Sequence, residues 1–323
     1  MTPTRNASLF PPHFDGEHFF NPGGKQARGL SDVVRWKLTS RAAKSPDFLD
    51  DVQASVPPRT LPEDQIRITL VNHSTVLLQV NGLNILTDPI WSERASPFSG
   101  IGPRRHRAPG IRFADLPPID LVLLSHNHYD HCDLSTLQQL KQKHKSDYIV
   151  PLGLAKFFSK HQLPAAHELD WGDFLTLRGT TIHAVPALHF SARGLGDRNR
   201  TLWCGYLLET PNGPVYFAGD TAHGEHFDAI RKHYGPPLIA LLPIGAYEPR
   251  WFMSAVHMNP EDAVRAHQAL GAQRSIGIHH GTFQLADEPL DTPGEELESC
   301  RAKAGIDPRC FPMLRNGECL ELP

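Results

Sequence analysis

The sequence of 323 residues lacks several features that mark particular protein classes. Its five cysteines form no C-x-x-C pair and are odd in number, so we expect no disulfide framework and predict a reducing, cytoplasmic location. Residues 1–20 lack the basic and apolar segments of a secretory signal, and no apolar run approaches the length of about 18 residues that a membrane span needs. The net charge of -3 lacks the basic excess of a nucleic-acid-binding protein, so no nucleic-acid partner is expected.

The most informative stretch is Leu121–Asp133, where an apolar run of strand type ends in His126, His128, Asp130 and His131. Imidazole nitrogens and a carboxylate at this density, directly after a strand, are typical ligands of a divalent transition metal. A polar loop that is merely rich in histidine is the alternative. The metal site is favoured because similar residues follow other apolar segments further along the chain.

Strand-like and helix-like segments alternate over residues 61–323 and predict one α/β domain. Residues 1–60 are interrupted by Pro and Gly, and we expect an N-terminal extension laid over another surface. Within the extension, residues 31–44 have apolar side chains at helical spacing, with basic residues and Trp36 elsewhere on the helix. Such a helix either lies at a membrane interface or packs as an arm on the main domain.

Three further positions with ligand chemistry each follow an apolar segment of strand type: His189, Asp220, and either His279 or His280. Together with the first group they make about seven ligands at four strand ends, more than the four that a tetrahedral zinc ion uses. The pattern therefore predicts two ions at one edge of a β-scaffold, close enough to share a carboxylate and a hydroxide.

His126–His131 resembles the H-x-H-x-D-H signature of the metallo-β-lactamase superfamily. The resemblance implies an αβ/βα four-layer sandwich with the metals at one edge of two facing sheets. A narrower resemblance lies downstream: Ala246–Met253, His257, Pro260–Val264 and Ile278–Phe283 are similar to the phospholipases D that hydrolyse N-acylphosphatidylethanolamine. The octapeptide Ala246–Met253 is far more specific than the metal signature.

The resemblance implies a role for each ligand. One zinc would be held by His126, His128 and His189, the second by Asp130, His131 and His279, and Asp220 would bridge them. His280 would occupy the aromatic position that the family has beside its ligand. Asp130 and Asp220 are also the catalytic candidates, since either carboxylate could steer the proton of the attacking hydroxide.

Three residues are candidates for binding substrate: His73, Tyr247 and His257. His73 matches a family histidine near the metals, and a core histidine is the alternative. His257 would contact the substrate phosphate, and a histidine at a helix entry without a catalytic role is the alternative. Tyr247 belongs to the most specific segment of the resemblance.

The loop over residues 92–110 carries four consecutive basic side chains, Arg104, Arg105, His106 and Arg107. Such a cluster near a metal site can hold an anionic group of the substrate. A solvated surface loop explains the same residues equally well. The sequence leaves these two readings open.

The resemblance implies a zinc-dependent phosphodiester hydrolase of phospholipase D type. Its substrate would be an N-acylphosphatidylethanolamine-like phospholipid, and its products phosphatidic acid and an N-acylethanolamine. A hydrolase of the same fold that acts on a lactone, a thioester or a β-lactam is the alternative, because the ligands alone do not separate these reactions. A lipid substrate fits peripheral membrane contact through residues 31–44, and a homodimer is compatible with the family.

Overall fold

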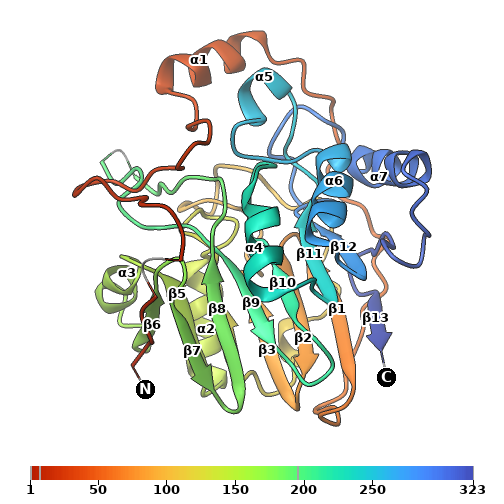
Figure 1. The fold of residues 1–323 in the computed structure, drawn as a ribbon. Helices are drawn as coiled ribbons and strands as arrows, with labels where there is room; N and C mark the ends of the chain where they lie inside the picture. The colour runs from red at the N-terminus through yellow and green to blue at the C-terminus, as the bar shows by residue number, and fades with distance from the viewer. Residues whose placement is uncertain (1, 7–8, 195, 323) are drawn as a thin grey trace.

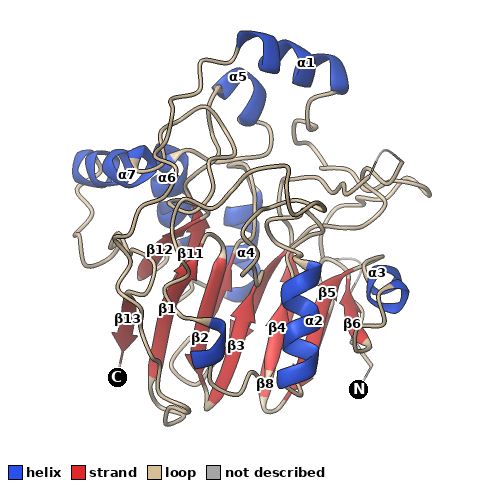
Figure 2. Cartoon of the chain, turned by 180° about the vertical axis from the view of Figure 1, so that it is seen from behind, coloured by secondary structure: helices blue, strands red, loops and turns tan. Residues whose placement is uncertain are grey.

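The computed structural model describes residues 2–6, 9–194 and 196–322, and these residues form two β-sheets packed face to face (Figures 1 and 2). In spatial order the first sheet consists of β13 (Cys319–Leu322), β1 (Ile66–Asn72), β2 (Thr75–Val80), β3 (Leu83–Thr87), β4 (Leu121–Leu123), β5 (Asp147–Pro151) and β6 (Ala166–Leu169). The second consists of β12 (Arg274–Ile278), β11 (Ile239–Pro243), β10 (Val215–Phe217), β9 (Gly205–Glu209), β8 (Thr180–Val185) and β7 (Phe174–Leu177).

Helices cover the outer face of each sheet and produce four layers. The first sheet carries α2 (Leu134–Lys143) and α3 (Ala155–Lys160), and the second carries α4 (His226–Tyr234), α6 (Pro260–Leu270) and α7 (Thr292–Lys303). A one-turn 3-10 helix, η1 (Phe113–Asp115), precedes β4. The predicted αβ/βα sandwich is confirmed.

Three apolar clusters fill the spaces between these layers. The central cluster joins the inner faces of both sheets and includes Ile68 and Ile182. The second lies under α4 and α6 and includes Phe227, and the third lies under α2 and α3 and includes Leu137 and Phe158. Strands buried on both faces are typically continuous apolar runs, which explains the composition of β4 and β11.

Strand direction determines where the polar loops gather. Strands β3 to β6 run parallel to one another, as do β10 to β12, whereas β9 is antiparallel to both of its neighbours, β8 and β10. Strands β4, β8, β10 and β12 therefore end at one edge of the sandwich. The loops that follow these four strands carry every predicted metal ligand.

The N-terminal extension contains one helix, α1 (Leu30–Thr39), which lies beside α5 (Arg250–Met253) above one end of the sheets (Figure 1). The prediction of a helix over residues 31–44 is wrong at its C-terminal end. The backbone turns away at Ser40, whose hydroxyl donates to Asp287 Oδ1 at 2.7 Å, and the indole N–H of Trp36 donates to the same oxygen at 3.0 Å. This shared acceptor ends the helix and fixes it to the main domain.

Asn81 and Gly82 join β2 to β3 with positive φ angles of 50° and 70°, as a two-residue hairpin turn requires. At α6, the side chain of Asn259 accepts the N–H of Asp262 at 2.9 Å in a complete capping box, which marks the start of this helix. Of the helices in the described part of the chain, none has the length and apolar character to cross a bilayer.

Candidate metal centre

The structure brings the predicted ligands together at the edge where β4, β8, β10 and β12 end. The ring nitrogens of His126 and His128 lie 2.8 Å apart, and Nε2 of His189 lies 3.2 Å from Nδ1 of His128. In a second group, Nε2 of His131 lies 3.2 Å from Oδ2 of Asp130. Each group gathers at least three ligand atoms within 4.8 Å of one another, which is the spacing that one metal ion needs.

Asp220 lies between the two groups. Its Oδ2 atom is 3.1 Å from Nε2 of both His131 and His279. The same oxygen is 4.0 Å from Nε2 of His126 and 3.8 Å from Nε2 of His189. A carboxylate in this position can bridge two ions.

The buried polar atoms of the centre fit a metal better than they fit one another. Within the described residues, Nε2 of His131, Nε2 of His279 and Oδ1 of Asp220 are buried without a hydrogen bond of regular geometry. Buried polar atoms are normally satisfied, so a group of three in one place requires an explanation. A divalent ion bound by imidazole nitrogens and carboxylate oxygens supplies it.

Burial and neighbouring charges act differently on the individual predicted ligands. Burial lowers the pKa of His128 to about 3 and that of His189 to about 4, so both rings are neutral and able to bind a metal at pH 7. Burial acts to raise the pKa of Asp220, but His131 and His279 outweigh it and hold that pKa well below its usual range. For His279, burial acts to lower the pKa, but Asp220 and Asp130 raise it to about 9.

Asp88 orients one ligand from behind, a role that the sequence did not reveal. Its carboxylate is fully buried, and Oδ2 accepts the Nδ1–H of His131 at 2.6 Å. Oδ1 of Asp88 accepts the main-chain N–H of Ser125 at 2.7 Å, and Oδ2 also accepts the hydroxyl of Ser125 at 2.6 Å. Such contacts fix the ring orientation of a metal-binding histidine. The available signal was an acidic residue directly after β3, the parallel neighbour of β4.

His73 lies behind the ligands and does not line the cavity beside them. The side chain is only 1% exposed, and its Nε2 lies 3.0 Å from Oδ2 of Asp130. The main-chain carbonyl of His73 also accepts the N–H of His279 at 2.9 Å. The predicted substrate contact therefore has no access here, and the geometry indicates a residue that positions ligands.

Tyr247 also differs from its predicted role as a substrate contact. It is buried, and its hydroxyl donates to Oε2 of Glu296 at 2.8 Å, away from the metal ligands. Its neighbour Ala246 faces the cavity instead. The specific octapeptide therefore contributes to the cavity wall through Ala246, Phe252 and Met253, since the phenol is turned into the protein.

The remaining two histidines differ in position. His257 lines the cavity, and its Nδ1 lies 4.0 Å from Oδ2 of Asp220, so it stays a candidate for binding substrate. His280 points away, with Nε2 at 3.2 Å from the carbonyl oxygen of Gly277, and His279 is the member of this pair that lies among the other predicted ligands.

The cavity beside the ligands has a volume of about 280 Å³. Its lining includes the predicted ligands His128, Asp130, Asp220 and His279. The apolar members of the lining include Val33, Trp36, Phe252, Met253, Val256 and Leu285, and Arg28 and Arg198 are its basic members. The N-terminal extension thus supplies part of the wall of the site.

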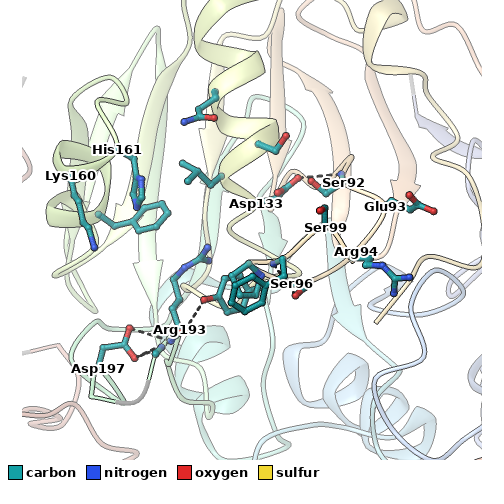
Figure 3. A pocket seen from close by; sticks show the side chains of 18 residues that line it. Ser92, Glu93, Arg94, Ser96, Ser99, Asp133, Lys160, His161, Arg193 and Asp197 are labelled. Carbon is teal, nitrogen blue, oxygen red and sulfur yellow. Dashed lines mark hydrogen bonds between the residues drawn. The ribbon is translucent and has the colours of Figure 1, made fainter. Parts of the chain in front are cut away.

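A larger cavity, of about 680 Å³, lies beside the ligand loop at α2 and α3 (Figure 3). It contains none of the predicted ligands. One guanidinium nitrogen of Arg193 donates to the carbonyls of Asn127 and Cys132 at 2.7 and 2.8 Å, and Asp197 accepts the main-chain N–H of Arg193. These contacts join the ligand loop to the loop that carries His189, and so support the centre from outside.

The basic cluster in the loop over residues 92–110 is structural. Arg105 is buried and donates to main-chain carbonyls, including that of Ser92 at 3.0 Å. Arg107 is paired with Asp51 and Asp291. The remaining two members, Arg104 and His106, contact Glu93 and the carbonyl of Pro46, and none of the four lines the metal cavity.

Comparison with known proteins agrees with this geometry. A family model described as "Beta-lactamase superfamily domain" matches residues 83–280, which include all the predicted ligands. The chain belongs to the metallo-β-lactamase superfamily. An isothiocyanate hydrolase from Delia radicum gut bacteria shares the fold with a TM-score of 0.61 at 21% identity, over 79% of this chain and 98% of that one.

Two sequence relatives extend the similarity beyond the matched segment. N-acyl-phosphatidylethanolamine-hydrolyzing phospholipase D 1 of Caenorhabditis elegans is 35% identical over 322 residues, covering 92% of this chain and 88% of the relative. An uncharacterized protein of Mycobacterium tuberculosis is 38% identical over 270 residues, covering 82% and 72%. The fold, the ligand cluster and these relatives identify the superfamily member as a metal-dependent hydrolase.

Proposed function

We propose that the protein is a dinuclear zinc hydrolase of phospholipase D type, which cleaves N-acylphosphatidylethanolamine-like phospholipids. The observation that carries the proposal is the 35% identity to the nematode phospholipase D along 92% of this chain. That similarity includes the extension and the cavity wall, which differ among hydrolases of one fold, as well as the ligands.

In the proposed reaction, water is consumed and the bond between phosphorus and the ethanolamine oxygen breaks. The phosphate remains on the diacylglycerol part as phosphatidic acid, and a proton passes to the departing N-acylethanolamine hydroxyl. Two bound divalent ions would supply Lewis acidity at the phosphate oxygens and lower the pKa of water toward 7. His126, His128 and His189 would hold one ion, and Asp130, His131 and His279 the other.

The residues of the chain would contribute orientation and proton transfer. Asp220 lies within 4.0 Å of a histidine in each ligand group, so its carboxylate would help to hold both ions. Asp130 is held from behind by His73 and remains ionised, which allows its second oxygen to accept a proton from water. His257 faces the cavity within reach of a substrate phosphate, and its neutral ring can donate or accept one hydrogen bond there.

The shape of the cavity supports a lipid with an anionic group. The lining combines four predicted ligands with apolar residues such as Trp36, Phe252 and Leu285, so a phosphate at the metals would place a hydrocarbon segment near apolar side chains. A β-lactam or a lactone needs no such combination of an anion site and an apolar lining.

A lipid substrate implies contact with a bilayer. We propose that α1 makes this contact. Leu38 is 82% exposed and Val34 is 52% exposed on this helix, with Arg35 and Lys37 exposed between them. Exposed apolar and basic side chains on one short helix fit the interface of an anionic membrane. Since α1 also lines the metal cavity through Val33 and Trp36, membrane contact would occur beside the site.

The proposal is tested with metal-loaded protein and a panel of substrates. We expect release of N-acylethanolamine and phosphatidic acid from N-acylphosphatidylethanolamine, and loss of both turnover and bound metal in Asp220→Asn. A protein that opens lactones and ignores every phosphodiester offered would overturn the proposal. Full activity in Asp220→Asn would overturn its dinuclear form.

A further inference from the structure

Two guanidinium groups at the rim of the metal cavity have no part in the chemistry described above. Arg28 lies in the N-terminal extension just before α1, and Arg198 lies in the loop between β8 and β9. Both side chains are exposed, and both line the cavity that contains Asp130 and Asp220. Segments 170 residues apart in the sequence thus place two fixed positive charges on one side of the site.

Neither guanidinium is neutralised within the described residues. Nη2 of Arg198 donates to the main-chain carbonyls of Ala27 and Arg28, at 2.9 Å in both cases. Nη2 of Arg28 donates to the main-chain carbonyl of Trp251 at 3.1 Å. A guanidinium has five N–H donors, so these contacts orient each group and leave several of its donors for a ligand.

The two arginines are braced against the metal centre. The guanidinium of Arg198 lies 5.3 Å from the ring centre of Phe190, which in turn packs on the ring of His128 at 4.5 Å. The extension is tied to the same loop, because the side-chain amide of Asn21 donates to the carbonyl of His189 at 2.9 Å. The two arginines would therefore already be held in position beside the cavity before a substrate binds.

The charge of the cavity indicates what the pair would bind. Asp130 and Asp220 are the acidic side chains of its lining, and both belong to the predicted ligand set. With the ions bound, the cavity carries an excess of positive charge that two arginines increase. Guanidinium groups match phosphate oxygens in geometry as well as charge, often with two parallel hydrogen bonds.

We propose that Arg28 and Arg198 form an anion subsite that binds a phosphomonoester dianion next to the metal centre. For the enzyme, this group is the phosphate of the phosphatidic acid product, whose charge exceeds that of the diester. The identity of the lipid rests on the proposed function. The binding of a phosphate group by the two arginines does not depend on it. The subsite makes the enzyme selective for anionic substrates and sensitive to inhibition by its product.

The test is calorimetric binding of two probes to the full-length, metal-loaded protein: inorganic phosphate and dihexanoyl phosphatidic acid. We expect Arg28→Gln and Arg198→Gln each to raise the Kd for dihexanoyl phosphatidic acid by about 5- to 20-fold, in line with charge-assisted hydrogen bonds. Arg28→Lys should fall between the wild type and Arg28→Gln. Arg265→Gln is the matched control, because Arg265 is exposed on α6 and does not line the cavity.

The two probes separate the sources of the anion. Weaker binding of both probes in the Gln variants supports a subsite for phosphate itself, and weaker binding of the lipid alone supports a subsite for the glycerol-linked phosphate. Unchanged Kd values for both probes in variants with wild-type thermal unfolding would overturn the subsite. Arginine-dependent binding without turnover of any phosphodiester would refute the proposed function and leave the subsite standing.

Discussion

Nε2 of His73 lies 3.0 Å from Oδ2 of Asp130, while the main-chain carbonyl of the same histidine accepts the N–H of His279. One buried residue outside the predicted ligand set thus contacts two of the residues that we propose as ligands of a second ion. Burial lowers the pKa of His73 to about 3, so its ring is neutral and donates to the carboxylate through Nε2–H. The contact fixes the carboxylate of Asp130, whose Oδ2 atom also lies 3.2 Å from Nε2 of His131 and 3.4 Å from Nε2 of His279.

Replacement of His73 tests this arrangement. His73 has a positive φ of 48°, so we choose His73→Asn, because Asn tolerates a left-handed backbone better than Ala. The shorter side chain does not reach Asp130, and we expect affinity for the second ion to fall by about 10- to 100-fold, the usual cost of losing such a partner. Competition with a chromophoric chelator measures the affinity, and an unchanged value would contradict the positioning role.

Asp88 should act in a similar way on His131. Asp88→Asn removes the negative charge that accepts the Nδ1–H of this ligand, and we expect weaker binding of the second ion, again by about 10- to 100-fold. Asp115→Asn is the control, because that carboxylate pairs with Arg112 away from the site. Equal metal affinity in the two variants would show that Asp88 does not orient the ligand.

The pH dependence of metal uptake follows from His279. In the metal-free protein, its pKa is raised from 6.5 to about 9, so its proton competes with the ion throughout the neutral range. Metal affinity should therefore rise with pH up to about 9 and be accompanied by proton release. The proton stabilises the metal-free fold below pH 6.5, and this contribution is lost as pH rises through 9.

Isothermal titration calorimetry in buffers of different ionisation enthalpy counts the protons that metal binding releases. The wild type should release at least one proton per chain at pH 7. His279→Gln, which lacks the titrating ring, should release fewer. A pH-independent affinity between 6 and 9 would contradict the protonation assigned to His279.

Membrane contact through α1 is tested by Val34→Glu and Leu38→Glu. These side chains are exposed, so the substitutions should leave the fold intact, whereas deletion of the extension would remove the buried Phe10 and Phe19. We expect binding to phosphatidylglycerol vesicles to weaken by about tenfold, because each carboxylate opposes insertion and repels the anionic surface. Turnover of a soluble short-chain phosphodiester should remain at the wild-type rate. Unchanged vesicle binding would show that α1 does not contact the membrane.

Local chemistry made much of the fold predictable. The apolar spacing of Leu134–Lys143 and Pro260–Leu270 predicts two helices with the bounds that α2 and α6 have, and Asn259 is recognisable as the N-cap of α6. The clustering of the seven predicted ligands was predictable because strand ends gather at one edge of such a sandwich. By contrast, β6 and β13 were missed, since both lie at sheet edges with few buried side chains and depend on pairing with distant strands. Helix α7 has no regular apolar stripe and was missed as well.

The surroundings of the centre were less predictable than its ligands. Asp88 and the carbonyl of Val256 orient His131 and His189 through contacts that span 43 and 67 residues. Nothing in a local pattern indicates such partners. The same applies to Arg28, which reaches the cavity only because the extension folds back over α5. Tyr247 is the opposite case. It belongs to the most specific segment of the resemblance, but its hydroxyl bonds to Glu296 and its side chain does not line the cavity.

We propose that the seven predicted ligands form one centre for two ions and that this centre hydrolyses a phospholipid-type phosphodiester. Its most direct test is to titrate metal-free protein with zinc while bound metal and release of N-acylethanolamine from N-acylphosphatidylethanolamine are measured together. Activity should reach its maximum at two zinc ions per chain. Full activity with a single ion, or no hydrolysis of the phosphodiester with two ions bound, would contradict it.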